Sequence, residues 1–452
     1  MPIQNPTLEQ IEYRLVLVLR ETNEVLTEYD GASYRLPRVT ISRWRRLAEE
    51  LPKMIKARWH LSVIILDFPQ SADGSLPCAV AELCSTRDLG KLTATGLDRL
   101  HKAEIDSQQL ATIVGILAGD SGERGPFSRI GWIEEAIHWL SAETGKTISS
   151  PAGILQYNAS GAFALVRFRM RDGSAYWMKA TGAPNTHELD VTATLSALCP
   201  GYLPLLIAVR SDWNAWLMED AGQALEVGVC LFELEQAVVS MAALQKTTIG
   251  LTEELLSAGV VDQRIAVLRE RSTEVFDYLE EAMAQQTSTE VLRLERRRLS
   301  EIGHILEDAC FRMEALHIPD TVMHGDMNRG NILFDGSHCR FTDWSETYIG
   351  NPFVTFQHLS LLNTVHEQQE LNDLRLKEAY KRSWIGVLNT AEMDAAFALI
   401  PLLAVASCLY GRGDWLQSPH RNDLDRQRYA RSLARHMDRA AQAPQLLEAL
   451  CH

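Results

Sequence analysis

The feature that most constrains the fold is a polar segment between two β-like runs, VMHGDMNRGNILFDGSHCRFTDWSE at residues 322–346. Asp326 and Asn331 lie on a loop that enters the first run, NILF, and Asp343 ends the second run, CRFTDW. A hairpin made of these runs would bring the loop and Asp343 together. Two carboxylates and an amide at one place supply hard oxygen ligands, which suit Mg²⁺ rather than zinc.

The spacing of these residues fits phosphoryl transfer. That chemistry asks for a loop Asp near the attacking hydroxyl group, an Asn five residues later as a metal ligand, and a later Asp between metal and phosphate. The HGD tripeptide alone would also fit an ordinary turn stabilised by an Asp side chain. Asn331 and Asp343 at this spacing favour phosphoryl transfer over the plain turn.

On these residues the sequence resembles the aminoglycoside phosphotransferase family, which has a protein-kinase-like fold. The family's HGDxxxxN loop and following DW are matched by His324, Gly325, Asp326, Asn331, Asp343 and Trp344. The resemblance implies that Asp326 is the catalytic residue that orients the acceptor hydroxyl group and takes its proton. It implies that Asn331 and Asp343 hold Mg²⁺ and that His324 braces the loop through hydrogen bonds. A purely structural role for His324 is equally open.

The segment after the DW pair departs from the family. The family commonly continues with a glycine, a proline and an acidic residue that supports the catalytic loop. Here the sequence IGNPFVTFQHL keeps Gly350 and Pro352 but contains no Asp or Glu. Support for the loop must therefore come from another residue.

A cation for nucleotide phosphates is found upstream, at Lys179 in the strand-like run AYWMKA. A buried lysine is costly unless it is paired. Glu188 matches the glutamate that the family pairs with its strand lysine, and the pair would hold the α- and β-phosphates of ATP. Asp190 is a competing partner for Lys179. The structural alternative is an edge-strand lysine and a glutamate that favours a helix N-terminus.

Two further segments match weaker family features. Ser160 and Gly161 lie in a turn between β-like runs, where the family covers the phosphates, although one glycine is also ordinary turn chemistry. The segment LMEDAG contains Met218 and Glu219, where the family's hinge meets the adenine through backbone groups. An ordinary strand end would give the same pattern.

We therefore expect an α+β chain with a bilobal protein-kinase-like fold, preceded by a separate small α/β domain. Residues 1–125 would form the N-terminal domain, 126–220 a small β-rich lobe, and 221–452 a large helical lobe that carries the catalytic loop. The polar segment DSGERGP at 120–126 is typical of a domain boundary. The N-terminal domain faintly resembles a Nudix hydrolase, but Glu49 and Glu50 stand without the rest of that motif, so it is expected to be non-catalytic.

Charge and composition limit the partners. The chain has 44 Lys and Arg against 59 Asp and Glu, a formal net charge of −15, which disfavours nucleic-acid binding and suits a cationic acceptor. The eight cysteines are scattered without zinc spacing. The N-terminal sequence MPIQNPTLEQ has no secretion-signal pattern, so a cytoplasmic location is expected. The longest apolar run, 395–410, contains Pro401 and predicts a buried helix rather than a membrane span.

Two functions remain. The first is an ATP- and Mg²⁺-dependent kinase that phosphorylates a hydroxyl group of a small molecule, with GTP left open as the nucleotide. The second is a catalytically inactive, kinase-like nucleotide-binding protein that signals through its N-terminal domain. Both predict nucleotide binding, and only turnover separates them.

Overall fold

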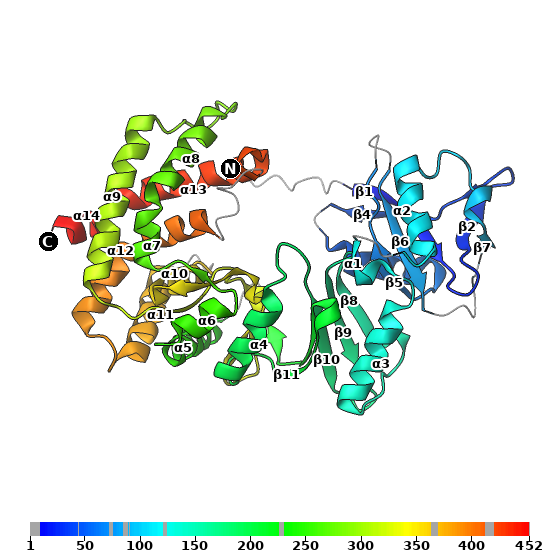
Figure 1. The fold of residues 1–452 in the computed structure, drawn as a ribbon, viewed down its shortest axis with the longest axis horizontal. Helices are drawn as coiled ribbons and strands as arrows, with labels where there is room; N and C mark the ends of the chain where they lie inside the picture. The colour runs from blue at the N-terminus through cyan, green and yellow to red at the C-terminus, as the bar shows by residue number, and fades with distance from the viewer. Residues whose placement is uncertain are drawn as a thin grey trace. The chain divides into compact units, whose positions relative to one another are not determined.

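The computed structural model describes residues 10–43, 45–71, 76–84, 89, 91–120, 124–225, 230–362, 369–411 and 420–451. It divides into two compact units: unit 1 is Met1–Leu189 with Leu206–Asp220, and unit 2 is Asp190–Leu205 with Ala221–His452. Unit 1 is rich in strands and unit 2 is mainly helical, which confirms the predicted α+β class (Figure 1). The described residues do not include 121–123, which belong to the expected domain boundary. They also do not include residues 1–9 of the N-terminal sequence.

The N-terminal part of unit 1 is a seven-stranded mixed sheet. Its main path is β3–β2–β1–β6–β5, with β4 paired to β1 and β7 paired to β2. The β1–β6 pair is parallel and the other pairs are antiparallel. The strands are β1 (Gln10–Val18), β2 (Val25–Tyr29), β3 (Tyr34–Arg35), β4 (Arg38–Ser42), β5 (Val63–Asp67), β6 (Cys78–Leu83) and β7 (Thr93–Thr95), and the helices are α1 (Leu47–Trp59) and α2 (Ser107–Leu117).

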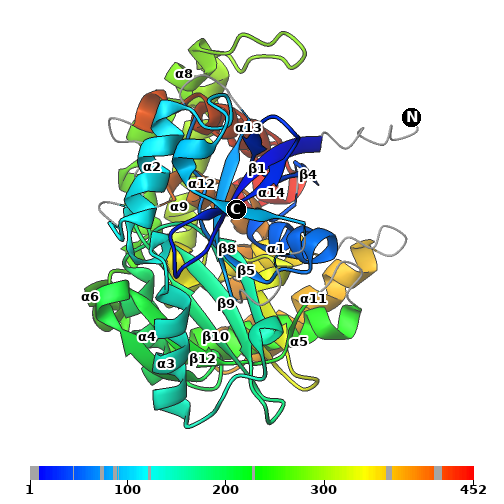
Figure 2. The same ribbon diagram turned by 90° about the vertical axis from the view of Figure 1, so that its right-hand side faces the viewer.

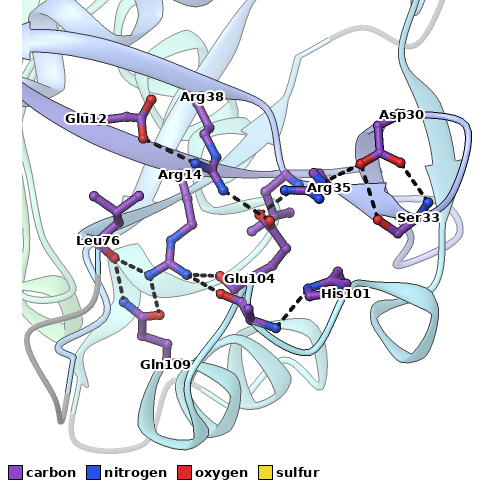
Figure 3. Close-up of polar contacts among 12 residues, drawn as sticks. Glu12, Arg14, Asp30, Ser33, Arg35, Arg38, Leu76, His101, Glu104 and Gln109 are labelled. Carbon is purple, nitrogen blue, oxygen red and sulfur yellow. Dashed lines mark hydrogen bonds and ion pairs between the residues drawn. The ribbon is translucent and has the colours of Figure 1, made fainter.

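A buried arginine ties the loops of this sheet together. Arg14 on β1 donates to the carbonyl oxygens of Leu76 and Glu104 and, at 3.3 Å, to Gln109 Oε1 on α2 (Figure 3). The buried Glu104 carboxylate in turn accepts from Arg38 Nη2 at 3.1 Å. Because buried polar groups are costly when unpaired, this network fixes the segment before α2 against β1.

The second sheet of unit 1 has five antiparallel strands in the order β11–β12–β10–β9–β8. Side chains on β10 alternate between buried and half-buried, as expected for a strand with two different faces. Helix α3 contacts this sheet at β11. The elements are α3 (Trp132–Thr144), β8 (Ile154–Ala159), β9 (Ala164–Arg169), β10 (Ala175–Ala180), β11 (Leu206–Arg210) and β12 (Ala215–Glu219), and α4 (Glu188–Leu198) begins at the end of this unit's first segment.

One apolar core joins the two sheets of unit 1. Val16 and Val80 from the seven-stranded sheet share a cluster with Val166 and Phe168 from the five-stranded sheet, and Trp132 of α3 completes it. Strands β5 and β8 lie next to each other, with α1 beside β8 (Figure 2). Residues before and after position 125 are therefore packed in one compact unit.

Unit 2 is built of helices around two small sheets, β13–β16–β17 and β14–β18–β15. The strands are β13 (Gln223–Ala224), β14 (Val261–Asp262), β15 (Thr321–His324), β16 (Ile332–Phe334), β17 (Cys339–Phe341) and β18 (Thr347–Gly350). The helices after α4 are α5 (Leu231–Thr247), α6 (Thr252–Ser257), α7 (Ile265–Glu270), α8 (Ser272–Ala284), α9 (Arg296–Ala315), α10 (Pro352–Ser360), α11 (Gln369–Trp384), α12 (Thr390–Tyr410), α13 (Leu424–Ala441) and α14 (Pro444–Cys451).

Helix α12 contains the long apolar run found in the sequence. It continues through Pro401 and has 21 residues, so it is long and apolar enough to cross a membrane by length and composition. In the structure 67% of its most apolar window is buried, against α9, α10 and α13 among others. Its burial matches the predicted buried helix, although the helix is longer than the apolar run suggested.

Candidate functional site

His324 ends strand β15 and is held from three sides. Strand β15 is buried throughout and pairs with β18, with His324 opposite Thr347. The His324 Nε2 atom lies 2.9 Å from the carbonyl oxygen of Thr342, and its ring lies 4.7 Å from that of Trp344. Since a carbonyl oxygen can only accept, Nε2 carries the hydrogen. These contacts connect β15 with the chain that follows β17.

The loop after His324 brings Asp326 and Asn331 together. The Asn331 side-chain amide donates to the Asp326 carbonyl oxygen at 2.8 Å and to Asp326 Oδ2 at 3.2 Å. The Asn328 amide donates to the same Oδ2 atom at 3.0 Å. Both amides thus hold one carboxylate oxygen, and neither donates to Oδ1. The carboxylate is therefore oriented through Oδ2.

The hairpin of β16 and β17 returns the chain to this loop. Ile332 pairs with Phe341, and the Thr342 N–H donates to the Asn331 carbonyl oxygen at 3.0 Å. Asp343 follows with φ 68°, a left-handed conformation that Asp tolerates better than most residues. Asp343 therefore directly follows Thr342, the residue that bonds to Asn331. Its Oδ1 atom accepts from Ser345 Oγ at 3.3 Å.

The side-chain oxygens of Asn331 and Asp343 are of the kind that Mg²⁺ binds in proteins. The Asn331 amide nitrogen is used by Asp326, which leaves its oxygen Oδ1 to coordinate, and Asp343 adds a carboxylate. Within the described ranges, no group of three or more His, Cys, Asp or Glu side chains could hold a metal ion. A set of one or two carboxylates with an amide is what Mg²⁺ uses when waters and substrate phosphates complete its octahedron.

Support for the loop comes from Thr355, which sequence reasoning missed. The His324 backbone N–H donates to Thr355 Oγ1 at 3.2 Å, and Thr355 is fully buried. Asn351 caps α10 by accepting from the Phe353 N–H at 3.0 Å, and this cap sets the first turn of the helix against β15. The Thr355 hydroxyl group thus accepts the kind of bond that an acidic residue was expected to accept.

His358, one turn further along α10, lies next to the same loop. Burial lowers the pKa of His358 to about 4, the neighbouring His324 adds to this shift, and the Asp326 carboxylate opposes it. Its Nε2 atom lies 3.4 Å from Cys408 Sγ on α12. His358 is therefore neutral at pH 7, and no feature of the sequence marked it.

In unit 1 the structure pairs Lys179 with Glu188. Lys179 lies on the central strand β10, and its Nζ atom is 2.5 Å from Glu188 Oε1 at the start of α4. The two side chains are only 12% and 1% exposed. The Lys179 ammonium group also lies 5.7 Å from the centre of the Trp216 ring on β12. Asp190, the competing partner, is exposed.

Gly161, in the turn between β8 and β9, packs closely against residues 124–128. A Cβ atom on Gly161 would lie 1.9 Å from the Arg124 carbonyl oxygen and 2.6 Å from Ser128 Oγ. The Phe127 N–H donates to the Gly161 carbonyl oxygen at 3.0 Å. Ser160 Oγ accepts from the Phe163 N–H at 3.1 Å, which closes the turn. Close backbone packing therefore accounts for the glycine at 161.

Met218 and Glu219 lie at the end of β12, opposite Trp177 and Tyr176 of β10. Met218 is buried with Trp216 and Leu189, whereas Glu219 is exposed. The next residue, Asp220, accepts from Arg167 Nη2 at 2.6 Å. The end of β12 is thus fixed to β9 by an ion pair.

Comparisons with known proteins give distant matches only. No family model matches the chain, and no curated protein matches it. Among solved structures, a choline/ethanolamine kinase family protein from Mesorhizobium loti is 17% identical; the match covers 71% of this chain and 98% of that one, with a TM-score of 0.45.

Two other solved structures are similar to the same degree. An ethanolamine kinase from Plasmodium vivax is 14% identical, with 78% of this chain and 98% of that one covered and a TM-score of 0.47. An aminoglycoside phosphotransferase from Alicyclobacillus acidocaldarius is 14% identical, with 66% and 93% covered and a TM-score of 0.38. The last bears the name of the family that the sequence resembles. Because these similarities are distant, the function proposed below rests on the chain's own residues.

Proposed function

We propose that this protein is a nucleotide-dependent phosphotransferase that moves a phosphoryl group from ATP to a hydroxyl group of a small molecule. The observation that carries the proposal is the local assembly in unit 2. The amide of Asn331 binds Asp326, and the β16–β17 hairpin places Asp343 one residue beyond the Thr342 contact with Asn331. A proton acceptor and two oxygen ligands are the groups that phosphoryl transfer to an alcohol requires.

Asp326 is the general base of this proposal. Its Oδ2 atom is held by Asn328 and Asn331, so the carboxylate cannot turn freely. Oδ1 then accepts the proton of the acceptor hydroxyl group and orients its oxygen toward the phosphorus atom. His324 acts through the loop backbone and is a positioning residue.

Asn331 Oδ1 and the Asp343 carboxylate would hold Mg²⁺, which when bound neutralises the charge on the transferred phosphoryl group. Lys179, held by Glu188, would bind the phosphates of ATP or GTP. Its ammonium group is nearly buried and paired with Glu188, so its position is fixed. Met218 and Glu219 would meet the base through backbone groups, and the turn that contains Ser160 and Gly161 would lie near the phosphates.

The acceptor is proposed to be a small hydroxylated molecule, and a cationic one is favoured. The chain's formal net charge of −15 attracts cations over distances of about 8–10 Å at physiological salt. A screen of hydroxylated metabolites and aminocyclitols for ADP release would identify the class.

The decisive experiment compares Asp326→Asn with wild type on the best acceptor from that screen. Asn keeps the size of the side chain and removes its basicity, so turnover should fall by roughly 10²–10⁴-fold while ATP still binds. Asp308→Asn, an exposed position on α9, is the matched control and should keep wild-type turnover. If Asp326→Asn retains turnover, Asp326 is not the base.

The role of Lys179 is tested separately by ATP affinity. Lys179→Met removes the charge and keeps the chain length, and ATP should bind at least tenfold more weakly. Lys102→Met changes an exposed lysine of the same unit and should leave the affinity unchanged. Unchanged affinity in Lys179→Met would remove that lysine from the nucleotide site. Wild-type protein that binds ATP without turnover on any acceptor would favour the inactive nucleotide-binding protein.

A further inference from the structure

The edge strands of the two sheets in unit 1 are joined by one side chain. Gln156 on β8 accepts from the Ile65 N–H at 2.9 Å and donates to the Ile65 carbonyl oxygen at 3.0 Å. Its amide thus takes the place that a strand's peptide group would take beside β5. The pairing register shifts after Gln156 in β8 and after Ile65 in β5, so both strands are irregular at this contact.

The segment 124–128 makes a second contact, at the turn after β8. Gly125 has φ 101°, and a Cβ atom there would lie 2.5 Å from the Gly161 carbonyl oxygen. On the other side, a Cβ atom on Gly161 would overlap the Arg124 carbonyl oxygen. Two glycines therefore let the backbones touch, and the Phe127 N–H bonds to Gly161 across the contact at 3.0 Å.

Asp67 connects the two contacts. It is the last residue of β5, and its Oδ2 atom accepts from Ser128 Oγ at 3.1 Å and lies 3.9 Å from Arg124 Nε. Asp67 therefore holds both ends of the segment that packs on Gly161. Its side chain is 17% exposed, so water screens this pairing less than it screens a surface ion pair.

We propose that Gln156, Asp67 and residues 124–128 form a clamp through which the N-terminal sheet fixes the conformation of the β8–β9 turn, and so sets the affinity for nucleotide. The link between this clamp and nucleotide affinity rests on the proposed function. The turn leads into β9, whose Leu165 pairs with Lys179 of β10, so the turn and the phosphate-binding lysine belong to one hydrogen-bonded ladder. A turn held in one conformation avoids the entropy loss of ordering it when a ligand binds.

The test uses the full-length protein and two conservative variants. Gln156→Met keeps the volume and removes both bonds to Ile65, and Asp67→Asn keeps an acceptor for Ser128 and removes the charge next to Arg124. Gln108→Met, on an exposed position of α2, is the matched control. Amide hydrogen exchange is followed at Phe127 and Phe163, whose N–H groups bond to Gly161 and Ser160. ATP affinity is measured at equilibrium without an acceptor.

The clamp predicts exchange at both amides at least tenfold faster in Gln156→Met, a smaller increase in Asp67→Asn, and wild-type rates in Gln108→Met. ATP should bind at least fivefold more weakly in Gln156→Met. Unchanged exchange at both amides overturns the clamp, and faster exchange with unchanged ATP affinity overturns its link to the nucleotide. Wild-type protein that binds no ATP overturns the proposed function and this link, while the exchange rates still decide whether the clamp fixes the turn.

Discussion

Gly325, in the loop between His324 and Asn331, has almost no free space around it. A Cβ atom on Gly325 would lie 2.3 Å from Tyr348 Cε2 and 2.7 Å from the Glu346 carbonyl oxygen. The Gly325 N–H donates to that same carbonyl oxygen at 2.6 Å. The glycine before Asp326 is thus required because the loop is pressed against the chain around β18.

Gly325→Ala should therefore destabilise the protein by about 1–3 kcal/mol and lower turnover, since the added methyl group must displace backbone atoms. Gly330→Ala is the control in the same loop, because its Cβ atom would meet only the Asn328 side chain, at 3.1 Å. Chemical denaturation measures the free energy of unfolding of both variants. Equal free energies of unfolding for the two variants would contradict this account of the loop.

Thr355 gives a second prediction at this scale. Thr355→Val keeps the shape and leaves the His324 N–H without its acceptor, which should cost about 1–3 kcal/mol of stability. Turnover should fall while ATP affinity stays unchanged, because the loop shifts and the nucleotide residues of unit 1 do not. Thr355→Ser restores the hydroxyl group and should recover most of the turnover. If Thr355→Ser loses as much turnover as Thr355→Val, the packing of the methyl group matters instead of the hydrogen bond.

The closeness of Asp326, Asn331 and the chain next to Asp343 could be predicted from sequence because it depends on spacings along one short segment. The catalytic role of this loop stays a prediction. Asp326 and Asn331 are five residues apart, and the hairpin that returns to Asp343 is local. Thr355 could not be predicted in the same way, because the bond it makes is defined by how α10 packs on β15. A hydroxyl group there accepts this hydrogen bond in place of the carboxylate that the family commonly has.

At the scale of elements, strand β15 begins next to a half-buried carboxyl group. Burial raises the pKa of Asp320, the residue before β15, to about 6 from an ordinary value of 3.8, and Arg264 opposes the shift. The folded protein therefore holds this proton over a pH range where the unfolded chain has lost it. This proton stabilises the fold at low pH, and the contribution is lost as the pH rises through about 6.

Asp320→Asn should remove that dependence. The variant should match wild type near pH 4 and be more stable near pH 7.5, by roughly 1–3 kcal/mol. Urea denaturation at both pH values measures the difference, with Asp308→Asn as the exposed control that should show no such trend. Equal stability of Asp320→Asn and wild type at both pH values would show that Asp320 titrates normally.

The glycine turn at 160–163 is an element whose local sequence was informative but incomplete. The sequence left phosphate contact or ordinary turn chemistry open for the single glycine, and the structure shows close backbone packing on it. The turn itself lies between the runs that predicted it. Its neighbour, the segment 124–128, lies more than thirty residues earlier, and no local pattern connects the two. Long-range backbone packing of this kind depends on the completed fold.

At the scale of the whole molecule, the two sheets of unit 1 share one apolar core, and a second core lies between the N-terminal sheet and α1. Phe168 of β9 is fully buried beside Val16 and Val80 of the seven-stranded sheet. The sequence predicted the two β-rich segments but not this sharing, because each segment is apolar enough to suggest a core of its own. The strand order of the N-terminal sheet could not be predicted from local sequence patterns either.

Phe168→Ala should cost about 3–5 kcal/mol and lower hydrogen-exchange protection in β6 as much as in β10, since both strands line the same core. The exposed Leu155→Ala on neighbouring β8 is the control and should change protection little. Native-state hydrogen exchange resolves the strands individually. Protection lost in β10 alone would mean that the two sheets of unit 1 unfold independently.

The Gln156 amide has a further consequence for the behaviour of the chain in concentrated solution. The edges of β5 and β8 are the places where a strand of another molecule could add, and unpaired sheet edges are the usual starting points of aggregation. The Gln156 side chain occupies the backbone N–H and carbonyl oxygen of Ile65 on the edge of β5, so an added strand cannot pair with that residue. Chains that lose this amide should therefore self-associate through exposed strands before they lose their helices.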